Sequence, residues 1–418
     1  MDGGSEEPHE WAEDRNVAWK VELEGAGHAS PVVWGKKIYV LSALRTDRTP
    51  EPEQSRRDVP SAMPASLQQQ GSRRGRPPRA EAPTHLYQFL VSAYDLDSGK
   101  RLWRTVVREE VPHEGLHSTA SQASASPVTD GKHVWAFFGS RGLYCLDSAG
   151  KVVWSADLGT QRTRNEFGEG ASPVVHGDLV VVNWDHEGDS FIVALDKKTG
   201  EERWRVPRDE PTSWSTPLVV QDGDTEVLVV SAATRVRGYA LETGKELWSV
   251  GGLGLNVVPT PVADDETVWV MSGWREAYGM AIRYKGARGD LVGTGRVAWA
   301  TDRDLSYVPS PVLVDGRVYF YKRFTGILSC YELSSGKPCY ETQRVEGLDD
   351  IYASPVAAAG RIYTVSRDGT GFVVRAGKTF ELLARNQLDD IFNATPAVVD
   401  DSLVLRGDRY LYRLTSKP

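Results

Sequence analysis

The chain has few cysteines, no excess of positive charge and no long apolar run, and each absence excludes a class of protein. Its 418 residues include 3 cysteines, too few for a disulfide framework. Lys and Arg number 49 against 57 Asp and Glu, and this net charge of −8 argues against a nucleic-acid partner. No apolar run approaches the roughly 18 residues of a membrane-spanning helix, so we expect none. No signal peptide is recognised in the sequence.

What the chain has in abundance is an internal repeat. A Ser-Pro or Thr-Pro pair followed by a Val, Leu or Ala run recurs at Ser30, Ser126, Ser172, Thr216, Thr260, Ser310, Ser354 and Thr395. After a first interval of 96 residues, the pairs lie 41 to 50 residues apart, which is the spacing of one propeller blade per repeat. A turn glycine stands four residues before an aromatic residue in most repeats, as in Gly200 and Trp204. Short β-branched runs between Gly and Asp turns predict a four-stranded antiparallel meander in each repeat.

The two chain ends predict how the repeats close into a ring. After Pro396 only three strands remain, AVVD, SLVLRG and RYLYRL, whereas residues 16–20 supply Trp19 at a fourth-strand position. We therefore expect an all-β, eight-bladed β-propeller of four-stranded antiparallel blades, closed by the N-terminal strand, which completes the last blade. In this interpretation residues 1–15 are a polar leader, and residues 16–418 form a single propeller domain.

One long segment of the first repeat does not fit a blade. Between the strands KKIYVLS and YQFLVSAYD, an insertion at about 45–84 is rich in Arg, Pro and Gln and has almost no aliphatic residues. Such a segment cannot repay the entropy cost of ordering, so we expect it to be disordered. Its arginines either dock a polyanion or belong to a tolerated surface insertion.

Antiparallel order within each blade determines which loops share a face. If the strands run a, b, c, d from the channel outward, the d-to-a crossovers and the b-to-c loops lie on one face, here called the crossover face. The short Gly/Asp hairpins lie on the opposite face, the turn face. We expect the ligand-binding candidates at the channel mouth of the crossover face: His28, Trp184, Trp214, Asn256, Trp274, Tyr307, Tyr352 and Asn393. The tryptophans either offer stacking platforms or plug the channel mouth.

Titratable residues concentrate in the same loops. The candidates for catalytic roles are His113, His117, Arg162, Arg164 and His186, because such groups can move protons or bind a carboxylate. The candidates for metal ligands are Asp185, His186, Glu187 and Asp189 in one loop. Their spacing matches no fixed zinc signature. The loop therefore either binds a divalent metal or is a solvated loop whose histidine contacts a backbone carbonyl.

The Ser-Pro start, the ALDKKTG hairpin and the following Trp204 resemble the pyrroloquinoline-quinone-like (PQQ-like) repeat from Trp19 onward. The stretches EFGEGASPVV, NWDHEGDSFIVALDKKTG, DEPTSWSTPLVV and YVPSPVL resemble an uncharacterised extracytoplasmic bacterial branch, related to the lipoprotein propeller that assists outer-membrane barrel assembly. The resemblance implies docked tryptophans and a periplasmic or extracellular location. Quinone-dependent alcohol dehydrogenases of this repeat hold their cofactor beside a disulfide between adjacent cysteines. This chain has no adjacent cysteines and no recognisable calcium set, so we do not expect the quinone.

Three functions follow as hypotheses. The first is a monomeric, non-catalytic binding or scaffold propeller that engages a protein or a glycan through the crossover face and needs no cofactor. The second is a carbohydrate-active lyase or hydrolase with a His/Arg/carboxylate site at the channel mouth of that face, with or without a divalent metal. The third is a quinone-dependent oxidoreductase. We expect the first.

Overall fold

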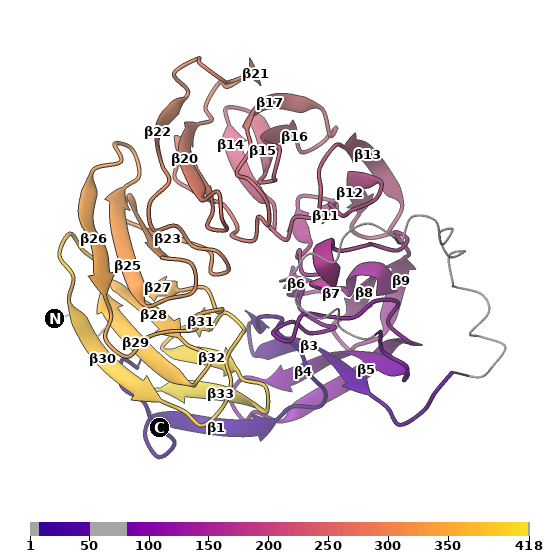
Figure 1. The fold of residues 1–418 in the computed structure, drawn as a ribbon. Helices are drawn as coiled ribbons and strands as arrows, with labels where there is room; N and C mark the ends of the chain where they lie inside the picture. The colour runs from indigo at the N-terminus through magenta and orange to yellow at the C-terminus, as the bar shows by residue number, and fades with distance from the viewer. Residues whose placement is uncertain (1–7, 51–81, 417–418) are drawn as a thin grey trace, which may run out of the picture.

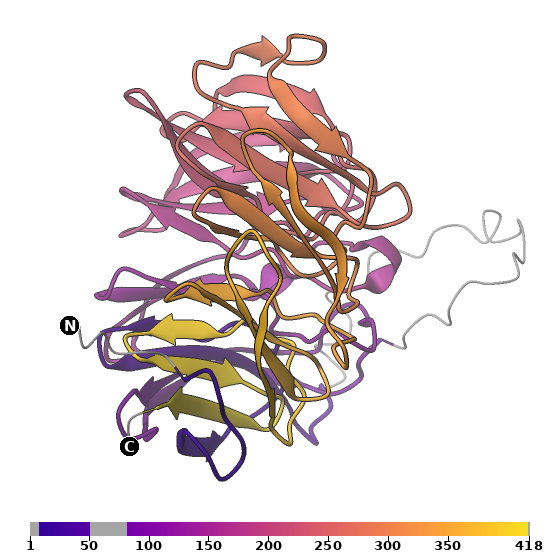
Figure 2. The same ribbon diagram turned by 90° about the vertical axis from the view of Figure 1, so that its left-hand side faces the viewer.

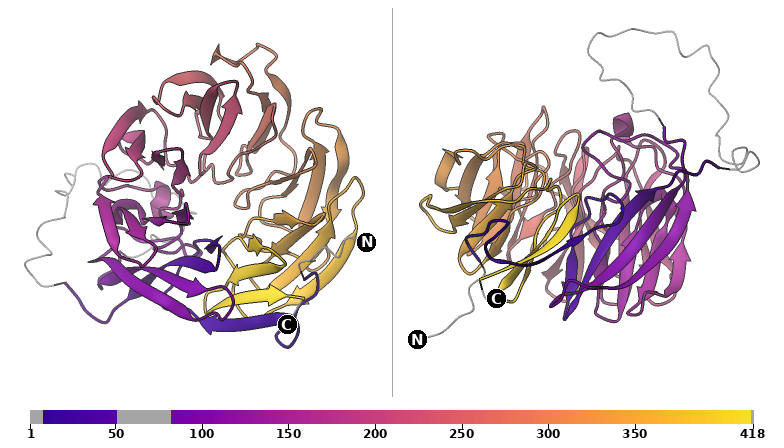
Figure 3. Two further views of the ribbon diagram at one scale, coloured as in Figure 1. Left: turned by 180° about the vertical axis from the view of Figure 1, so that it is seen from behind. Right: turned by 90° about the horizontal axis from the view of Figure 1, so that it is seen from below.

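The computed structural model describes residues 8–50 and 82–416, and it confirms the eight-bladed β-propeller (Figure 1). Eight antiparallel sheets follow one another around the ring in chain order, as the view from behind also shows (Figure 3). Seven sheets have four strands, and the fourth has a fifth strand added in parallel. The strands are short runs rich in β-branched residues, and turn glycines separate them. In β11, for example, all six residues are buried.

Blade 1 consists of β2 (Val32–Trp34), β3 (Lys37–Arg45), β4 (Tyr87–Asp95) and β5 (Arg101–Glu110). Blade 2 consists of β6 (Val128–Thr129), β7 (His133–Phe137), β8 (Leu143–Asp147) and β9 (Val152–Ala156). Blade 3 consists of β10 (Val174–His176), β11 (Leu179–Trp184), β12 (Ser190–Asp196) and β13 (Glu202–Arg208). Blade 4 consists of β14 (Leu218–Asp222), β15 (Thr225–Val230), β16 (Arg235–Ala240), β17 (Glu246–Gly251) and the added β21 (Gly289–Asp290).

Blade 5 consists of β18 (Val262–Ala263), β19 (Thr267–Ser272), β20 (Tyr278–Arg283) and β22 (Val297–Thr301). Blade 6 consists of β23 (Val312–Val314), β24 (Arg317–Tyr321), β25 (Ile327–Glu332) and β26 (Pro338–Arg344). Blade 7 consists of β27 (Val356–Ala358), β28 (Arg361–Val365), β29 (Thr370–Arg375) and β30 (Leu382–Gln387). Blade 8 consists of β31 (Ala397–Val399), β32 (Ser402–Arg406), β33 (Tyr410–Thr415) and, from the other end of the chain, β1 (Val17–Glu22).

The N-terminal strand closes the ring as predicted. β1 lies beside β33 (Figures 1 and 2) and pairs with it antiparallel. Its register runs from Val17 opposite Leu414 to Glu22 opposite Tyr410. The segment predicted to be a polar leader contains a buried tryptophan, Trp11, which is 3% exposed. Its indole lies against Gly371 of blade 7, a blade whose own fourth strand has no tryptophan.

Docked tryptophans explain the recurring glycine and tryptophan of the repeat. Five indoles, those of Trp19, Trp103, Trp154, Trp204 and Trp299, donate Nε1–H to a carbonyl of the next blade at 2.6 to 3.2 Å. Each indole also covers a turn glycine of that next blade. Gly200, for example, has φ +76, and a Cβ built on it would lie 2.6 Å from the Trp154 ring. Only glycine fits both the backbone conformation and the close approach.

The Ser/Thr-Pro pairs join neighbouring blades near the channel. At most seams the backbone N–H of the Ser or Thr donates to the hydroxyl of its counterpart in the next blade, as Ser30 does to Ser126 at 3.0 Å and Thr395 to Ser30 at 3.2 Å. Seven of the eight seams have this bond in the described chain. The seam between blades 4 and 5 differs. There Ser215 donates instead to the carbonyl of Pro259 at 2.9 Å, and Trp248 packs inside its own blade against Gly238.

The predicted disorder of the insertion at 45–84 concerns mainly residues 51–81, which lie outside the described residues. Its described ends extend the hairpin of β3 and β4, because Thr46 N–H donates to Leu86 at 2.9 Å and Leu86 N–H to Arg48 at 2.8 Å. In the described part of the chain, no helix has the length and apolar character needed to cross a membrane.

Candidate functional site on the crossover face

Contacts between loops show that the two predicted sets of connections share one face. The backbone N–H of Glu187, in the β11–β12 loop, donates to the carbonyl of Arg162, in the β9–β10 crossover, at 2.8 Å. The N–H of Arg162 donates in turn to Nδ1 of His186 at 3.1 Å. Farther round the ring, Trp274 of the β19–β20 loop stacks on Tyr307 of the β22–β23 crossover, with ring centroids 4.7 Å apart. The loops of the crossover face therefore hold one another in place.

A polar pocket lies on this face between blades 2, 3 and 4. Its volume is about 590 Å³, counting the part open to solvent. Its charged and aromatic lining includes Glu114, Arg141, Glu169, Asp185 and Trp214. These residues come from crossovers and b-to-c loops that are far apart in the sequence, so the pocket exists only in the assembled ring.

Glu114 lies in the β5–β6 crossover and has a strongly perturbed carboxyl group. It accepts a hydrogen bond from Oγ1 of Thr163 at 2.5 Å and another from the backbone N–H of Thr163 at 3.2 Å. Burial raises the pKa of Glu114 to about 7; the Thr163 bonds oppose this rise, and the nearby carboxylate of Glu169 adds to it. The carboxyl group is therefore partly protonated near neutral pH.

His113, beside Glu114, is held through both ring nitrogens. Nε2 lies 2.6 Å from the carbonyl oxygen of Gln161, and Nδ1 lies 2.9 Å from Nη2 of Arg141. Because a guanidinium can only donate, Nδ1 accepts and Nε2 carries the proton. Burial, and then the charge of Arg141, lowers the pKa of His113. The imidazole is therefore a neutral link between two loops.

Arg141 is a buried cation, 4% exposed, at the end of the 3₁₀ turn η3 (Gly139–Arg141). Its Nη1 lies 3.2 Å from Oε1 of Glu169, and its Nε lies 3.2 Å from Oε1 of Glu110. Glu169 also accepts hydrogen bonds from Ser140, from N–H at 2.6 Å and from Oγ at 2.5 Å. Gly139 has φ +58, and a Cβ there would lie 1.5 Å from Glu169, so a side chain would expel the carboxylate.

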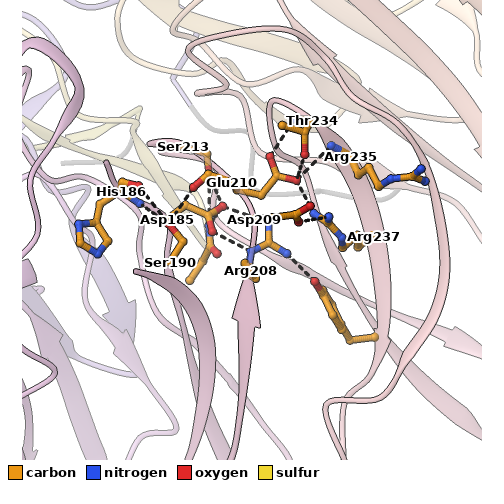
Figure 4. Close-up of polar contacts among 12 residues, drawn as sticks. Asp185, His186, Ser190, Arg208, Asp209, Glu210, Ser213, Thr234, Arg235 and Arg237 are labelled. Carbon is orange, nitrogen blue, oxygen red and sulfur yellow. Dashed lines mark hydrogen bonds and ion pairs between the residues drawn. The ribbon is translucent and has the colours of Figure 1, made fainter. Parts of the chain in front are cut away.

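A second charged group, buried between blades 3 and 4, centres on Asp185 and Arg208 (Figure 4). Both side chains are 0% exposed, and they pair at two points, with Nε to Oδ1 at 2.7 Å and Nη2 to Oδ2 at 3.0 Å. Ser213 donates to Asp185 at 2.8 Å, and Arg208 donates to the hydroxyl of Tyr239 at 2.6 Å. Buried charges are tolerated when they are paired and hydrogen-bonded in this way.

Glu210 extends this network into blade 4 (Figure 4). It is 5% exposed and accepts hydrogen bonds from Thr234, from Oγ1 at 2.6 Å and from N–H at 2.8 Å. Arg237 forms ion pairs with both Glu210 and Asp209. The charged residues at the end of β13 therefore fasten blade 3 to the β15–β16 loop of blade 4.

Three of the four predicted metal-ligand residues contact different protein groups through their side chains. Asp185 is held in the ion pair just described, and Glu187 accepts a hydrogen bond from Oγ1 of Thr212 at 3.0 Å. His186 accepts a backbone N–H at Nδ1, so Nε2 donates to the carbonyl of Asp189 at 3.3 Å. Asp189 is exposed. His186 thus contacts a backbone carbonyl, as one of the two alternatives for this loop expects, and metal binding by the loop stays a prediction.

Another group in the described part of the chain has metal-like spacing. Ligand atoms of His113, Glu114 and Glu169 lie within 4.8 Å of one another. Arg141 donates to two of these residues, and Nε2 of His113 carries a proton. A cation would have to displace both the guanidinium and this proton, so the group does not fit a resident metal.

The other catalytic candidates lie beside the pocket. His117 is exposed, with Nδ1 2.8 Å from Oγ1 of Thr119. Arg164 begins the 3₁₀ turn η4 (Arg164–Glu166), and its backbone N–H donates to Thr212 at 2.9 Å. Arg162 is exposed and donates from Nη2 to the carbonyl of Glu187 at 3.0 Å. The side chains of His117, Arg162 and Arg164 do not line the pocket.

The tryptophans of this region differ in exposure. Trp184 is 2% exposed and stacks on Phe191, with ring centroids 5.6 Å apart, in the core between blades 2 and 3. This burial corrects the expectation that Trp184 offers a stacking platform, because its ring faces are covered by protein. Trp214 is half-buried, lines the pocket and donates Nε1–H to the carbonyl of Gly168 at 2.6 Å.

The remaining candidates form groups elsewhere on the ring. At blades 4 to 6, Asn256 donates from Nδ2 to the hydroxyl of Tyr307 at 3.2 Å. At blades 7, 8 and 1, Nδ2 of Asn393 lies 3.2 Å from Nε2 of His28. The Arg367 guanidinium covers the ring of Tyr352, 5.1 Å from its centroid. Burial, and then the charges of Arg406 and Arg367, lowers the pKa of His28 to about 4, so this histidine is neutral.

Sequence reasoning missed the cations that organise the pocket and the network beside it. Arg208 lies close to Glu210 in VPRDEPTSW. This cluster of charges at the end of a strand was the signal that could have indicated a buried ion-pair network. Arg141 follows Gly-Ser in a loop, where nothing in the sequence distinguishes it from a solvated arginine.

Eight blades joined by docked indoles and Ser/Thr hydroxyls define a PQQ-like-repeat propeller. Its crossover face carries a polar site whose charged side chains pair with one another. The family model described as "Outer membrane protein assembly factor BamB" matches residues 88–338 and 213–417. Because these matches cover well over half of the sequence, the chain belongs to this family.

Three known proteins illustrate what this chain is similar to. The outer membrane protein assembly factor BamB of Yersinia pestis is 23% identical over 321 residues, 76% of this chain and 67% of the relative. The crystal structure of BamB from Moraxella catarrhalis matches with a TM-score of 0.56 at 16% identity, over 78% of this chain and 91% of that chain. A europium-containing methanol dehydrogenase matches with a TM-score of 0.59 at 12% identity, over 95% of this chain and 86% of that chain. At such identities the structural matches show the fold alone.

The cysteines of this chain do not fit the quinone site that the repeat implies. Cys145, Cys330 and Cys339 lie on β8, β25 and β26, and no two are adjacent in the sequence. A disulfide between adjacent cysteines, the feature beside the cofactor, therefore cannot form.

Proposed function

We propose that this protein is a non-catalytic binding propeller that holds a protein partner on its crossover face. The observation that carries the proposal is the internal pairing of the charged groups there, such as Asp185 with Arg208 and Glu210 with Arg237. Groups held in such pairs are poor acids, bases or nucleophiles, since their lone pairs and protons are already used. They also make the surface rigid, and a rigid surface loses little conformational entropy on binding.

The family to which this chain belongs supports a protein as the molecule bound on the crossover face. Its model and the Yersinia pestis relative carry the name of an assembly factor for outer membrane proteins. By analogy with these relatives, we also propose a location outside the cytoplasm. A quinone-dependent oxidoreductase is not proposed, because the cysteines do not fit the cofactor.

Photo-crosslinking from the two faces tests this proposal. The full chain would carry p-benzoylphenylalanine in place of Arg162, exposed on the crossover face, or of Lys198, exposed on the turn face. After irradiation in the source cells, adducts would be identified by mass spectrometry. We expect a defined protein adduct from position 162 and none from position 198. Equal adducts from both positions, or adducts from 198 alone, would contradict the proposal. Binding to a glycan array that Arg162→Glu abolishes would replace the protein partner with a glycan.

A further inference from the structure

We infer that the partner's main contact is a patch at blades 4, 5 and 6, and that this patch takes an uncharged, apolar segment of the partner protein. The patch consists of Leu255, Asn256, Trp274 and Tyr307 and is called the seam patch. The inference rests on the proposed function and adds the place of binding and the chemistry of the bound segment: an aromatic or aliphatic side chain packed on Trp274 and Leu255.

The absence of charge distinguishes one segment of the seam patch, the β17–β18 crossover that carries Leu255 and Asn256. The β17–β18 crossover, residues 252–261, reads GLGLNVVPTP, and it is the one crossover in the described chain without a charged residue. Each of the other seven carries at least one carboxylate, such as Glu114 or Asp389. Cores of protein interfaces are depleted of charge and enriched in aromatic residues, with polar groups at the rim. Arg275 and Glu276, both exposed and next to Trp274, supply such a rim.

The anchor residues of the seam patch are held in place before any partner arrives. Trp274 and Tyr307 stack with ring centroids 4.7 Å apart and an interplanar angle of 28°, and both are half-buried. Asn256 holds the Tyr307 hydroxyl at 3.2 Å. Leu255 is 42% exposed and stands between half-buried Gly254 and buried Asn256. Fixed aromatic rings bind at a small entropy cost, and Trp and Tyr are the residues that dominate interface energies.

Asn256 lies at the base of the seam patch, with its amide oxygen unpaired in the described part of the chain. The residue is 3% exposed, and its Oδ1 accepts no hydrogen bond from the described residues. Its backbone is held at φ +61, and that of Arg275, on the facing loop, at φ +34. A buried amide oxygen without a donor is costly, and a water enclosed beneath a bound segment would recover that cost. Strained backbone in two facing loops is common at binding sites.

The path of the chain explains why the patch forms at this seam. Here the hydroxyl bond between successive Ser/Thr-Pro pairs is replaced, and the N–H of Trp214 donates to the carbonyl of Val257 at 2.8 Å. Gly254 packs against Glu276 of the blade 5 loop, where a Cβ would lie 3.1 Å from the Glu276 carbonyl. The crossover is therefore held at its base by two neighbouring blades, while Leu255 between these contacts remains exposed.

Peptide selection on the full chain tests the inference. A phage-displayed library of random dodecapeptides would be selected on the immobilised protein, and the Kd of the enriched peptides would be measured by fluorescence polarisation. We expect peptides with little net charge and at least one aromatic or aliphatic side chain. Trp274→Ala and Leu255→Asp should each weaken binding about tenfold or more. The control Trp34→Ala removes a tryptophan that is 54% exposed on the turn face, and it should change Kd less than about twofold.

Each outcome decides between the patch and the wider proposal. Enriched peptides that are strongly charged, a selection without binders, or binding indifferent to both variants would overturn the seam patch. Peptides weakened by Arg162→Glu but not by Leu255→Asp would overturn the patch and leave the proposed function standing. Peptides weakened only by Trp34→Ala would count against the proposed function itself. Leu255→Asp alters an exposed side chain, so it decides the test if Trp274→Ala fails to fold.

Discussion

Replacing Asp185 with alanine would reveal whether the charged network of Figure 4 serves structure or chemistry. Asp185 and Arg208 are both 0% exposed and pair at 2.7 and 3.0 Å. Asp185→Ala would leave the guanidinium buried, with the hydroxyl of Tyr239 as its remaining side-chain hydrogen-bond partner. Breaking one partner out of a buried pair costs about 3–5 kcal/mol, because the other charge stays without compensation. We expect a loss of that size in the free energy of unfolding, measured by urea denaturation.

A control from the same loop and a double-mutant cycle sharpen the measurement. Asp189 is exposed and forms no ion pair in the described chain, so Asp189→Ala should change stability by less than about 0.5 kcal/mol. Asp185→Ala combined with Arg208→Met should cost less than the sum of the single variants, with a coupling of about 2 kcal/mol or more. A cost below about 1 kcal/mol for Asp185→Ala, or a coupling near zero, would refute the structural role. Divalent ions that stabilise the wild type but not Asp185→Ala would instead indicate a metal ligand.

Three further changes have expected outcomes. The pKa of Glu114 is about 7 in the fold and 4.5 ordinarily, so its protonated form stabilises the fold. This contribution to the free energy of unfolding, up to about 3 kcal/mol, is complete below pH 4.5 and is lost as the pH rises through 7. The difference between wild type and Glu114→Gln, from denaturation at several pH values, should therefore change between pH 5 and 8, and a flat difference would contradict this. The pKa of His28, about 4 against 6.5, acts in the opposite sense: its contribution is full above pH 6.5 and is lost as pH falls through 4, so His28→Gln should differ from wild type in that lower window. Trp11→Ala should cost about 3–5 kcal/mol because the indole is buried against Gly371, whereas Trp34→Ala should cost about 1 kcal/mol or less; equal losses would count against the docking of Trp11.

The architecture could be predicted because the repeat signals are local. The Ser/Thr-Pro spacing and the turn glycines mark each blade within a window of some forty residues, and β1 could be assigned to blade 8 because that blade had three strands. The pairing of glycine with tryptophan could not be read so directly. Gly200 stands four residues before Trp204, but in the ring it receives Trp154 from the preceding blade.

The site was less predictable because its hydrogen bonds join distant residues. The loop from Trp184 to Asp189 contains every residue type a metal site needs, but Asp185 pairs with an arginine 23 residues away. Glu114 bonds to Thr163, 49 residues away, across the boundary of two blades. A sequence can place such residues on one face of the ring, and it does so here. It cannot say which neighbour each will bind, since a difference of a few ångströms decides between an ion pair and a free carboxylate.

The blade count, the closure of the ring and the division into two loop faces follow from residue order, because strand period, turn chemistry and antiparallel pairing act over short stretches of chain. The partners of Arg141, Arg208 and Glu210, the burial of Trp184 and the exposure of Leu255 were decided by the folded ring. These features depend on how neighbouring blades pack against one another, and that packing determines which polar groups lose water and which side chain is near enough to replace it.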